Sequence, residues 1–238
     1  MTTIAANLQA VRERIAQAAR AAGRSPSAVA LIAVSKTWPA AYIADAHACG
    51  QRAFGESYAQ EGVAKIERLA HFPLEWHFVG PVQSNKTRAI APHFHWVHSV
   101  DREKVARRLN DARPVALPPL NVCIQVNVSG EASKSGVRPG EELMLARAVL
   151  GLPRLRLRGL MAVPEPTADL ALQRQRFRLL RELKERLAQA GIVLDTLSMG
   201  MSDDFEAAIL EGSTMVRIGT AIFGPRPRAG AAAAKVSQ

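Results

Sequence analysis

The 238-residue chain has a formal net charge of +10, and hydrophobic and charged residues make up 48% and 22% of it. This is the composition of an ordinary globular protein with a sizeable core. No apolar run reaches the roughly 18 residues that cross a bilayer, so we expect a cytoplasmic protein that does not enter a membrane. Basic residues alternate with acidic ones, as in RLLRELKERLAQ, without interleaved aromatics, which argues against nucleic-acid binding. Cys49 and Cys123 lack the spacing of a metal site or a disulfide framework.

Short β-rich runs alternate with amphipathic helical segments along the whole chain. Eight such units with right-handed crossovers predict a (β/α)8 TIM barrel, as a single domain over residues 1–224. A doubly wound open sheet is the alternative, but the glycine-rich turn of a dinucleotide site is missing after the first strand. The residues before 25 are expected to add a helix on the bottom or side of the barrel, and 225–238 a disordered tail. The predicted strands are 29–35, 52–55, 75–80, 95–100, 121–129, 157–163, 194–200 and 214–219, and the predicted helices between them are 38–49, 57–70, 84–91, 101–111, 139–150, 168–190 and 202–212.

The first predicted strand ends on a lysine at the rim where this fold carries its chemistry. In LIAVSK, alternation puts Ile32, Val34 and Lys36 on one face of the strand. If the two branched residues fill the barrel interior, Lys36 enters the top of the same interior. Loss of hydration there favours a neutral amine, which is a nucleophile toward carbonyls. From this motif alone, a surface lysine at a strand end is an equally open interpretation.

The last two predicted strands supply an anion site on the same rim. In TMVRIGT, alternation aims Arg217 inward, and Gly219 and Thr220 follow just above it. A glycine followed by a small hydroxyl residue lets backbone N–H groups approach a phosphate, and SMGMS adds the hydroxyls of Ser198 and Ser202. Ordinary turns are the alternative. With the first-strand lysine, the pattern indicates a pocket for a phosphorylated aldehyde or ketone, as in a class I aldolase or a pyridoxal phosphate protein.

Seven motifs follow the order and spacing of a known family. They are VSKTWP, FGESYAQE, WHFVGPVQSNK, HSVDR, QVNVSGEASKSG, LRGLMAVPEP and LSMGMSDDFEAAILEGSTMVRIGTAIFG. Through them the chain resembles, from about residue 7 to residue 224, the pyridoxal phosphate homeostasis proteins, the YggS and PROSC group. The resemblance implies a fold-type III pyridoxal phosphate barrel, like the N-terminal domain of alanine racemase.

The resemblance also implies roles for individual residues. Lys36 would hold pyridoxal 5'-phosphate as a Schiff base, and Arg217 would face the pyridine nitrogen. A permanently charged guanidinium disfavours protonation of that nitrogen, so carbanion chemistry would be weakly supported. Ser57 stands where the family usually has an asparagine beside the cofactor, and its shorter side chain lacks the amide donor. The phosphate contacts would come from Ser198, Ser202, Gly219 and Thr220.

The implied function is non-enzymatic: binding of pyridoxal phosphate for its intracellular homeostasis, by buffering and with delivery to apo-enzymes as a further role. Alanine racemases add a β domain whose tyrosine is the second acid/base, and from the short segment after Gly224 we expect no such domain here. A racemase or decarboxylase of low activity and a class I aldolase are the enzymatic alternatives. The chain is expected to be a monomer or weak homodimer. Lys134, in EASKSG, is a candidate transient acceptor of the cofactor, whereas the role of Lys86 is left open.

Overall fold

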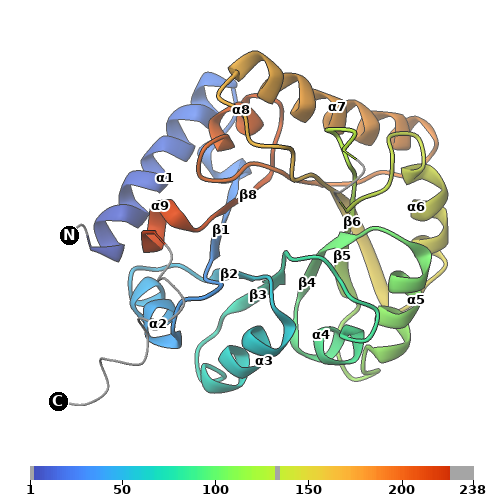
Figure 1. Cartoon of the computed structure of the whole chain (residues 1–238), viewed down its shortest axis with the longest axis horizontal. Coiled ribbons are helices and arrows are strands. Elements are labelled where there is room, and N and C mark those ends of the chain that lie inside the picture. The colour runs from blue at the N-terminus through green and yellow to red at the C-terminus, as the bar shows by residue number, and fades with distance from the viewer. Residues whose placement is uncertain (1–2, 132–134, 226–238) are drawn as a thin grey trace.

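The computed structural model describes residues 3–131 and 135–225 and shows a closed barrel of eight parallel strands arranged in chain order (Figure 1). Pairing of the first strand with the last closes the barrel, so the predicted (β/α)8 fold is confirmed and the doubly wound sheet is excluded. The predicted tail lies outside the described residues from 226 onward, as does Lys134. The strands are β1 (Ala30–Val34), β2 (Ala53–Glu56), β3 (Glu75–Phe78), β4 (Trp96–Val100), β5 (Leu120–Gln125), β6 (Leu155–Met161), β7 (Thr196–Ser198) and β8 (Met215–Ile218).

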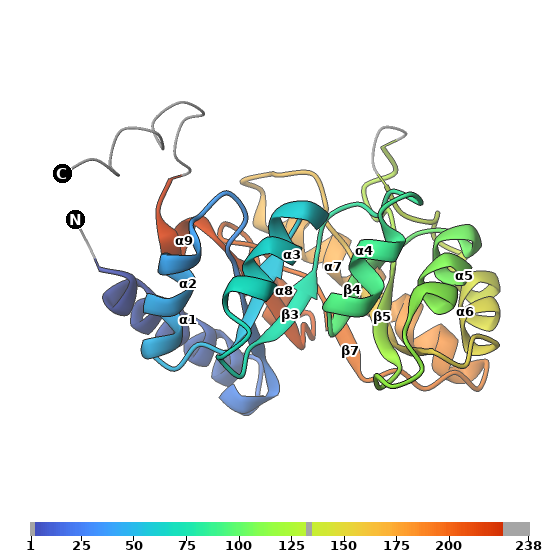
Figure 2. The same cartoon turned by 90° about the horizontal axis from the view of Figure 1, so that it is seen from below.

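Helices surround the strands on the outside of the barrel (Figures 1 and 2). Each predicted helix is present, with ends that differ from the prediction by a few residues. In the described part of the chain, no helix combines the length and the apolarity needed to span a membrane. The helices are α1 (Ile4–Ala21), the 3-10 helix η1 (Pro26–Ala28), α2 (Ala40–Ala48), α3 (Ala59–Arg68), α4 (Thr87–His93), α5 (Glu103–Ala112), α6 (Glu142–Leu150), α7 (Leu170–Gln189), α8 (Phe205–Leu210) and α9 (Thr220–Phe223).

The N-terminal helix α1 completes the outer ring. The helix that follows β8, α9, has only four residues and is too short to cover the outside of the last strand. Helix α1 fills that place on the side of the barrel, where it contacts α2, α8 and α9. Its buried residues Leu8, Val11 and Ile15 recur at three and four positions, as an amphipathic helix requires. Asn7 Nδ2 also donates to the backbone oxygen of Ile222 in α9, at 2.8 Å.

Alternation along the strands separates two packing layers. A methyl group built on Gly55 would lie 3.1 Å from a side-chain carbon of Ile32 and 3.3 Å from one of Val34, so both residues face the barrel interior, as predicted. Ala33 and Val216 instead belong to the larger core between the strands and the helices. A small separate cluster of Trp96, Cys123 and Met161 fills part of the interior.

Strands β6 and β7 approach each other too closely for a side chain at Gly159. A Cβ atom on Gly159 would lie 1.9 Å from the backbone oxygen of Thr196. Gly159 pairs with Cys123 on its other side, directly after the point where the register of β5 with β6 shifts. A glycine that marks a bulge and a close approach of two backbones is typical of a barrel wall.

We expect Gly159→Ala to lower the free energy of unfolding by about 3 kcal/mol or more, because the backbone of β7 must move away. Gly151→Ala is the matched control, since its nearest new neighbour is the Ala148 oxygen at 3.5 Å and its φ is −77°. That substitution should leave stability unchanged or raise it by up to about 1 kcal/mol. Urea unfolding followed by circular dichroism measures both, and equal stability of the two variants would contradict the expectation.

Candidate functional site

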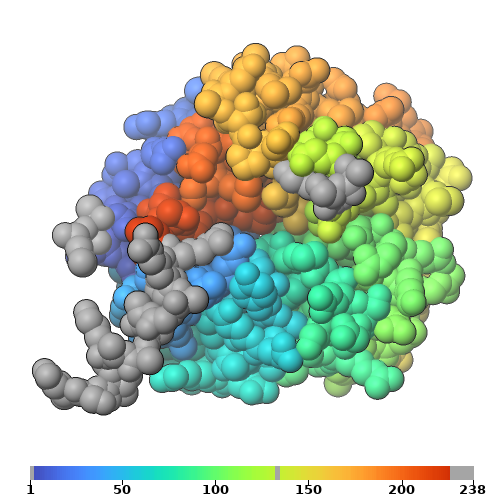
Figure 3. Space-filling model, in the orientation of Figure 1, coloured from blue at the N-terminus to red at the C-terminus, as the bar shows by residue number. Residues whose placement is uncertain are grey.

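A cavity of about 760 Å³ opens at the carboxyl ends of the strands. It lies between the beginning of the chain, coloured blue to cyan, and the orange to red segments of β7 and β8 (Figure 3). Six of the seven predicted site residues line it, and Ser198 does not. The lining residues are Val34, Lys36, Trp38, Ser57, Tyr58, Ala59, Gln60, Phe78, Val79, Gly80, Pro81, Gln83, Lys86, Gln125, Ser135, Met161, Val163, Met201, Ser202, Asp203, Arg217, Gly219 and Thr220.

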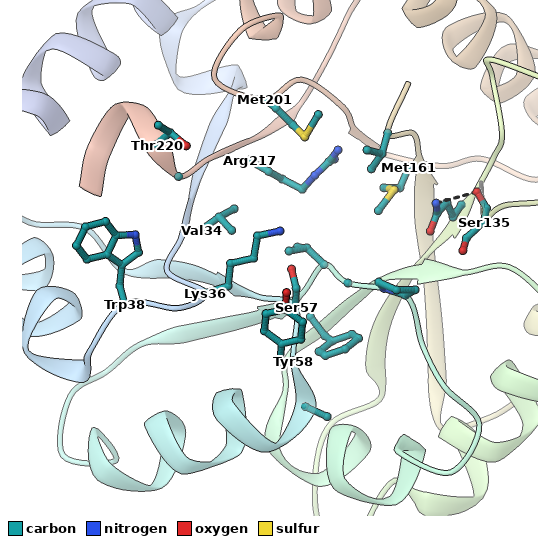
Figure 4. A pocket seen from close by; sticks show the side chains of 18 of the residues that line it. Val34, Lys36, Trp38, Ser57, Tyr58, Ser135, Met161, Met201, Arg217 and Thr220 are labelled. Atoms are coloured by element: carbon teal, nitrogen blue, oxygen red, sulfur yellow. Dashed lines mark hydrogen bonds between the residues drawn. The ribbon is translucent and has the colours of Figure 1, made fainter. Parts of the chain in front are cut away.

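Lys36 and Arg217 enter the cavity from neighbouring strands. Strand β1 pairs with β8 in a register that sets Ala33 opposite Ile218, so the loop that carries Lys36 follows directly beside the end of β8. Both side chains extend into the same space (Figure 4). Lys36 is half-buried, whereas Arg217 is only 5% exposed. An amine at the rim therefore lies above a guanidinium at the floor.

A buried ion cluster fixes the backbone on both sides of Lys36. We call Glu56, Glu61 and Lys65 the Lys65 clamp. Lys65 Nζ lies 2.8 Å from Glu56 Oε1 and 2.6 Å from Glu61 Oε1, and it donates to the Ser35 backbone oxygen at 2.8 Å. Ser35 Oγ donates to Glu56 Oε1 at 2.7 Å. On the other side of Lys36, the Thr37 backbone N–H donates to Glu61 Oε1 at 2.6 Å.

The Lys65 clamp holds a strained backbone conformation at Thr37 and includes the buried carboxyl of Glu56. Thr37 has a φ of 70°, a left-handed conformation that a β-branched residue rarely adopts without support from its surroundings. Glu56 is fully buried, and burial raises the pKa of its carboxyl despite the opposing effect of Lys65. Within residues 3–131 and 135–225, its Oε2 atom has no hydrogen-bond partner. A buried charge cluster of this kind is costly to disrupt by removing one member, so it fixes the conformation of the Lys36 loop.

The loops after β7 and β8 form the opposite wall of the cavity. Gly200 has a φ of 98°, and its backbone oxygen accepts from the Arg217 N–H at 2.9 Å. The Asp204 carboxylate accepts from the Met201 N–H at 2.6 Å and so holds the turn that presents Ser202. Burial raises the pKa of the Asp204 carboxyl.

Gly219 brings the backbone of the other loop close to β1. A Cβ atom on this residue would lie 3.0 Å from the Val34 oxygen. Thr220, directly after it, lines the cavity and is exposed. Hydroxyls and close-lying backbone thus gather at the side of the cavity that the sequence predicted for a phosphate.

Ser198 lies below the cavity floor and not on its wall. It is fully buried, and its Oγ accepts from Arg217 Nη1 at 2.6 Å. Arg217 Nη2 donates to the Ala162 backbone oxygen at 2.8 Å. Burial lowers the pKa of Arg217 to about 10, which leaves it charged at neutral pH. The placement of Ser198 departs from the phosphate contact that the resemblance implied, because alternation along β7 turns its side chain into the barrel under Arg217.

Ser57, which the resemblance placed beside the cofactor, lies on the cavity wall close to Gly80: a Cβ on Gly80 would lie 2.3 Å from the Ser57 oxygen. Lys86, whose role the sequence left open, and Tyr58, which is 55% exposed, line the outer part of the cavity. For the Lys65 clamp, the only signal in the sequence is an acidic residue four positions before a lysine in EGVAK, which is common on helix surfaces.

Comparison with known proteins shows which family has these features. The family model described as "Alanine racemase, N-terminal domain" matches residues 6–227. A Pseudomonas aeruginosa protein named "Pyridoxal phosphate homeostasis protein" is 63% identical over 226 residues, which cover 95% of this chain and 97% of that protein. The Escherichia coli K12 protein of the same name is 56% identical over 234 residues and covers 95% and 98%.

Solved structures agree with this assignment. The structure of PipY from Synechococcus elongatus with pyridoxal phosphate bound has a TM-score of 0.81 at 36% identity, over 93% of this chain and all of PipY. Alanine racemase from Corynebacterium glutamicum has a TM-score of 0.66 at 19% identity, over 94% of this chain and 62% of the racemase, which shows a shared fold. The chain therefore belongs to the alanine racemase N-terminal domain family and, within it, to the group of pyridoxal phosphate homeostasis proteins.

Proposed function

We propose that this protein binds pyridoxal 5'-phosphate through a Schiff base to Lys36 and serves the intracellular homeostasis of that cofactor. The observation that carries the proposal is the shared cavity of Lys36 and Arg217, with Ser202, Gly219 and Thr220 on its wall. The names of the relatives and the cofactor bound by PipY support it. In this proposal the protein buffers the reactive aldehyde in the cytoplasm and passes it to apo-enzymes.

The residues present fit the proposed cofactor. Lys36 supplies the amine, and the close approach of Gly219 to the Val34 oxygen leaves the backbone of the β8 loop bare toward the cavity. Ser202 and Thr220 supply hydroxyl donors for a phosphate. Arg217 supplies a cation at the floor of the cavity, where a pyridine nitrogen would accept a hydrogen bond from it.

The chemistry assigned to Lys36 is condensation with an aldehyde. Its amine nitrogen would form the C=N bond, and the aldehyde oxygen would leave as water with the two amine protons. The Lys65 clamp fixes Ser35 and Thr37, so the amine starts from a defined backbone position. When bound, the cofactor supplies an aldehyde that exchanges between amines and an aromatic ring that can accept electrons.

A carrier role is supported by the chemistry of Arg217. A guanidinium only donates hydrogen bonds and remains charged, so it cannot accept a hydrogen bond from a protonated pyridine nitrogen, and the unprotonated ring is a weak electron sink. Slow turnover of any amino acid is expected. Turnover at about 1 per second or faster would contradict the carrier role and favour a racemase or decarboxylase.

Delivery is tested by direct competition between transfer and leakage. Holo-protein is mixed with an apo-enzyme that requires pyridoxal phosphate, with and without an excess of a small-molecule amine that captures free cofactor. Delivery predicts that the enzyme regains activity faster than the cofactor reaches the scavenger. Complete suppression by the scavenger would mean buffering without delivery.

We expect Lys36→Ala to abolish the visible absorption band of the purified holo-protein, because no amine remains to form the Schiff base. Lys86→Ala is the matched control, since Lys86 lines the same cavity and its ammonium is not assigned to the covalent bond. Absorption spectra after borohydride reduction, with mass spectrometry of the labelled peptide, measure both. Loss of the band in Lys86→Ala and its retention in Lys36→Ala would contradict the assignment.

We expect Ser202→Ala and Thr220→Val each to weaken pyridoxal phosphate binding by about tenfold, because each removes one hydrogen bond to a charged group. Binding of pyridoxal, which lacks the phosphate, should be the same in both variants as in the parent protein. Titration monitored by absorption or fluorescence gives the dissociation constants. Equal losses for the two ligands would show that these hydroxyls do not contact the phosphate.

The Lys65 clamp yields a further prediction. Lys65→Met should lower the free energy of unfolding by about 3–5 kcal/mol, because Glu56 keeps a buried charge without its partner. Glu61→Ala is a milder change, since the side chain of Glu61 is 30% exposed, and it removes the acceptor of the Thr37 N–H.

We expect Glu61→Ala to release the cofactor several-fold faster than the parent protein. Glu103→Ala is its control, because Glu103 forms the same kind of helix-surface pair with Arg107 and is not among the residues that line the cavity. Release is followed as loss of the visible band in excess scavenger. Equal release by these two variants would show that the clamp does not position Lys36.

A further inference from the structure

A continuous chain of hydrogen bonds crosses the barrel interior below Arg217. His98 Nδ1 lies 2.7 Å from Ser198 Oγ, and His98 Nε2 lies 2.9 Å from His77 Nδ1. His77 Nε2 lies 2.7 Å from Glu75 Oε1. With the 2.6 Å contact from Arg217 Nη1 to Ser198 Oγ, four hydrogen bonds join Arg217 to Glu75. We call Ser198, His98, His77 and Glu75 the interior relay.

The relay joins the two ends of the barrel. Glu75 is the first residue of β3, at the end of the strands opposite the cavity, and its side chain is 50% exposed. His77 and His98 are fully buried, on β3 and β4. Ser198 and Arg217 come from β7 and β8, so the chain of contacts crosses the interior to strands that do not neighbour β3 or β4. Branched apolar residues usually fill this space, and buried polar groups there are costly unless every one is paired.

The two ends of the relay fix the direction of every hydrogen bond in it. A guanidinium only donates, so Ser198 Oγ accepts from Arg217 and its own hydrogen is directed to His98 Nδ1. His98 therefore carries its hydrogen on Nε2 and donates to His77 Nδ1. His77 then carries its hydrogen on Nε2 and donates to Glu75, which as a carboxylate only accepts.

The electrostatics agree with neutral histidines. Burial lowers the pKa of His77 and lowers that of His98 well below its usual range, with Arg217 acting in the same direction on His98. The hydrogen bond from His77 lowers the pKa of Glu75. The opposite order of hydrogens would need a protonated Glu75 and would leave the Ser198 hydroxyl hydrogen without an acceptor among the described residues.

We propose that the interior relay positions Arg217: the carboxylate of Glu75, acting through His77, His98 and Ser198, holds the guanidinium as a cation in one orientation. Without a proton from solvent at Glu75, the hydrogen order can reverse only if Arg217 gives a proton to Ser198 Oγ. Ser198 would pass its hydrogen to His98 Nδ1, His98 Nε2–H to His77 Nδ1, and His77 Nε2–H to Glu75. The products are a neutral guanidine and a protonated Glu75.

Other charged groups face the two ends of the relay without replacing it. Burial has the largest effect on the pKa of Arg217 and lowers it, and the nearby Asp204 and Cys123 oppose that effect. The ring of Trp96 stacks on His77 at 5.6 Å, and the Arg158 guanidinium lies 4.8 Å from the Trp96 ring. His95, which is outside the relay, contributes to lowering the pKa of Glu75, less than the hydrogen bond from His77 does. The effect of Arg217 on a pyridine nitrogen rests on the proposed function. The hydrogen order within the relay does not.

Nuclear magnetic resonance of the cofactor-free protein tests the hydrogen order directly. Two-bond ¹H–¹⁵N correlation spectra of the imidazoles should show both His77 and His98 neutral, with the hydrogen on Nε2, near neutral pH. A hydrogen on Nδ1 of either ring, or on both nitrogens of one ring, would overturn the proposal. This measurement does not depend on whether pyridoxal phosphate binds.

Glu75 variants test the positioning role. Glu75→Leu removes the acceptor, so a form of His77 with the hydrogen on Nδ1 should appear and the Arg217 guanidinium N–H groups should exchange with solvent about tenfold faster. Glu75→Gln keeps an oxygen acceptor, so His77 should retain its hydrogen on Nε2. A merely structural effect of losing the Glu75 carboxylate would not separate the Gln variant from the Leu variant. Glu67→Gln is the matched control, because Glu67 also lies beside a histidine, with its Oε1 3.8 Å from His93 Nε2, but outside the relay.

The outcomes separate the two proposals. Unchanged tautomers and unchanged guanidinium exchange in Glu75→Leu would overturn the positioning role. A correct hydrogen order in the apo-protein together with no covalent attachment at Lys36 would leave the relay standing and remove the proposed function. In the holo-protein, Glu75→Leu should release the cofactor several-fold faster than Glu67→Gln, and equal rates would show that the relay does not act on the cofactor.

Discussion

The parallel pairing of β1 with β8 is the interaction on which the site depends. It closes the barrel, and its register brings the end of β1, with Lys36 two residues beyond it, beside the end of β8, with Gly219 and Thr220. Residues about 180 positions apart in sequence thereby share one cavity wall. Helix α1 protects this junction from outside, because α9 is too short to do so. Helix α1 thus supports the β1–β8 pairing on which the cavity depends.

Two polar networks position Lys36 and Arg217, and both networks contain carboxylates. The Lys65 clamp holds the backbone beside Lys36 from the helix side of the barrel, and the interior relay reaches Arg217 from inside. Buried ion pairs contribute little net stability compared with apolar packing of the same volume, but they are costly to break. Their presence on both sides of one cavity is better explained by the need for fixed orientation than by stability of the fold.

The sequence predicted the barrel and most of the cavity, but not these networks. Period-two alternation was sufficient to turn Lys36 and Arg217 inward, because Arg217 lies on β8 and Lys36 follows two residues after β1, and the apolar residues of each strand define its two faces. It could not show that Ser198, at the end of the three-residue strand β7, lies below the cavity floor, since depth along the barrel axis depends on strand tilt and stagger. The pair His77 and His98 was equally hidden. No sequence pattern links two histidines on separate strands. Only the folded sheet brings His77 Nδ1 to 2.9 Å from His98 Nε2.

A site that holds an aldehyde and also gives it up must be open on the side from which the next amine or water arrives. On the inner side of the cavity, Arg217 is buried, and the Asp204 carboxylate holds the turn at Met201. On the outer side, Tyr58 and Gln60 are exposed and Lys86 is half-buried. In the proposed function, Arg217, Ser202 and Thr220 would hold the ring and the phosphate, and Lys36 would supply the amine. Because Arg217 is buried and the residues of the outer side are accessible, an incoming amine would approach Lys36 without displacing Arg217.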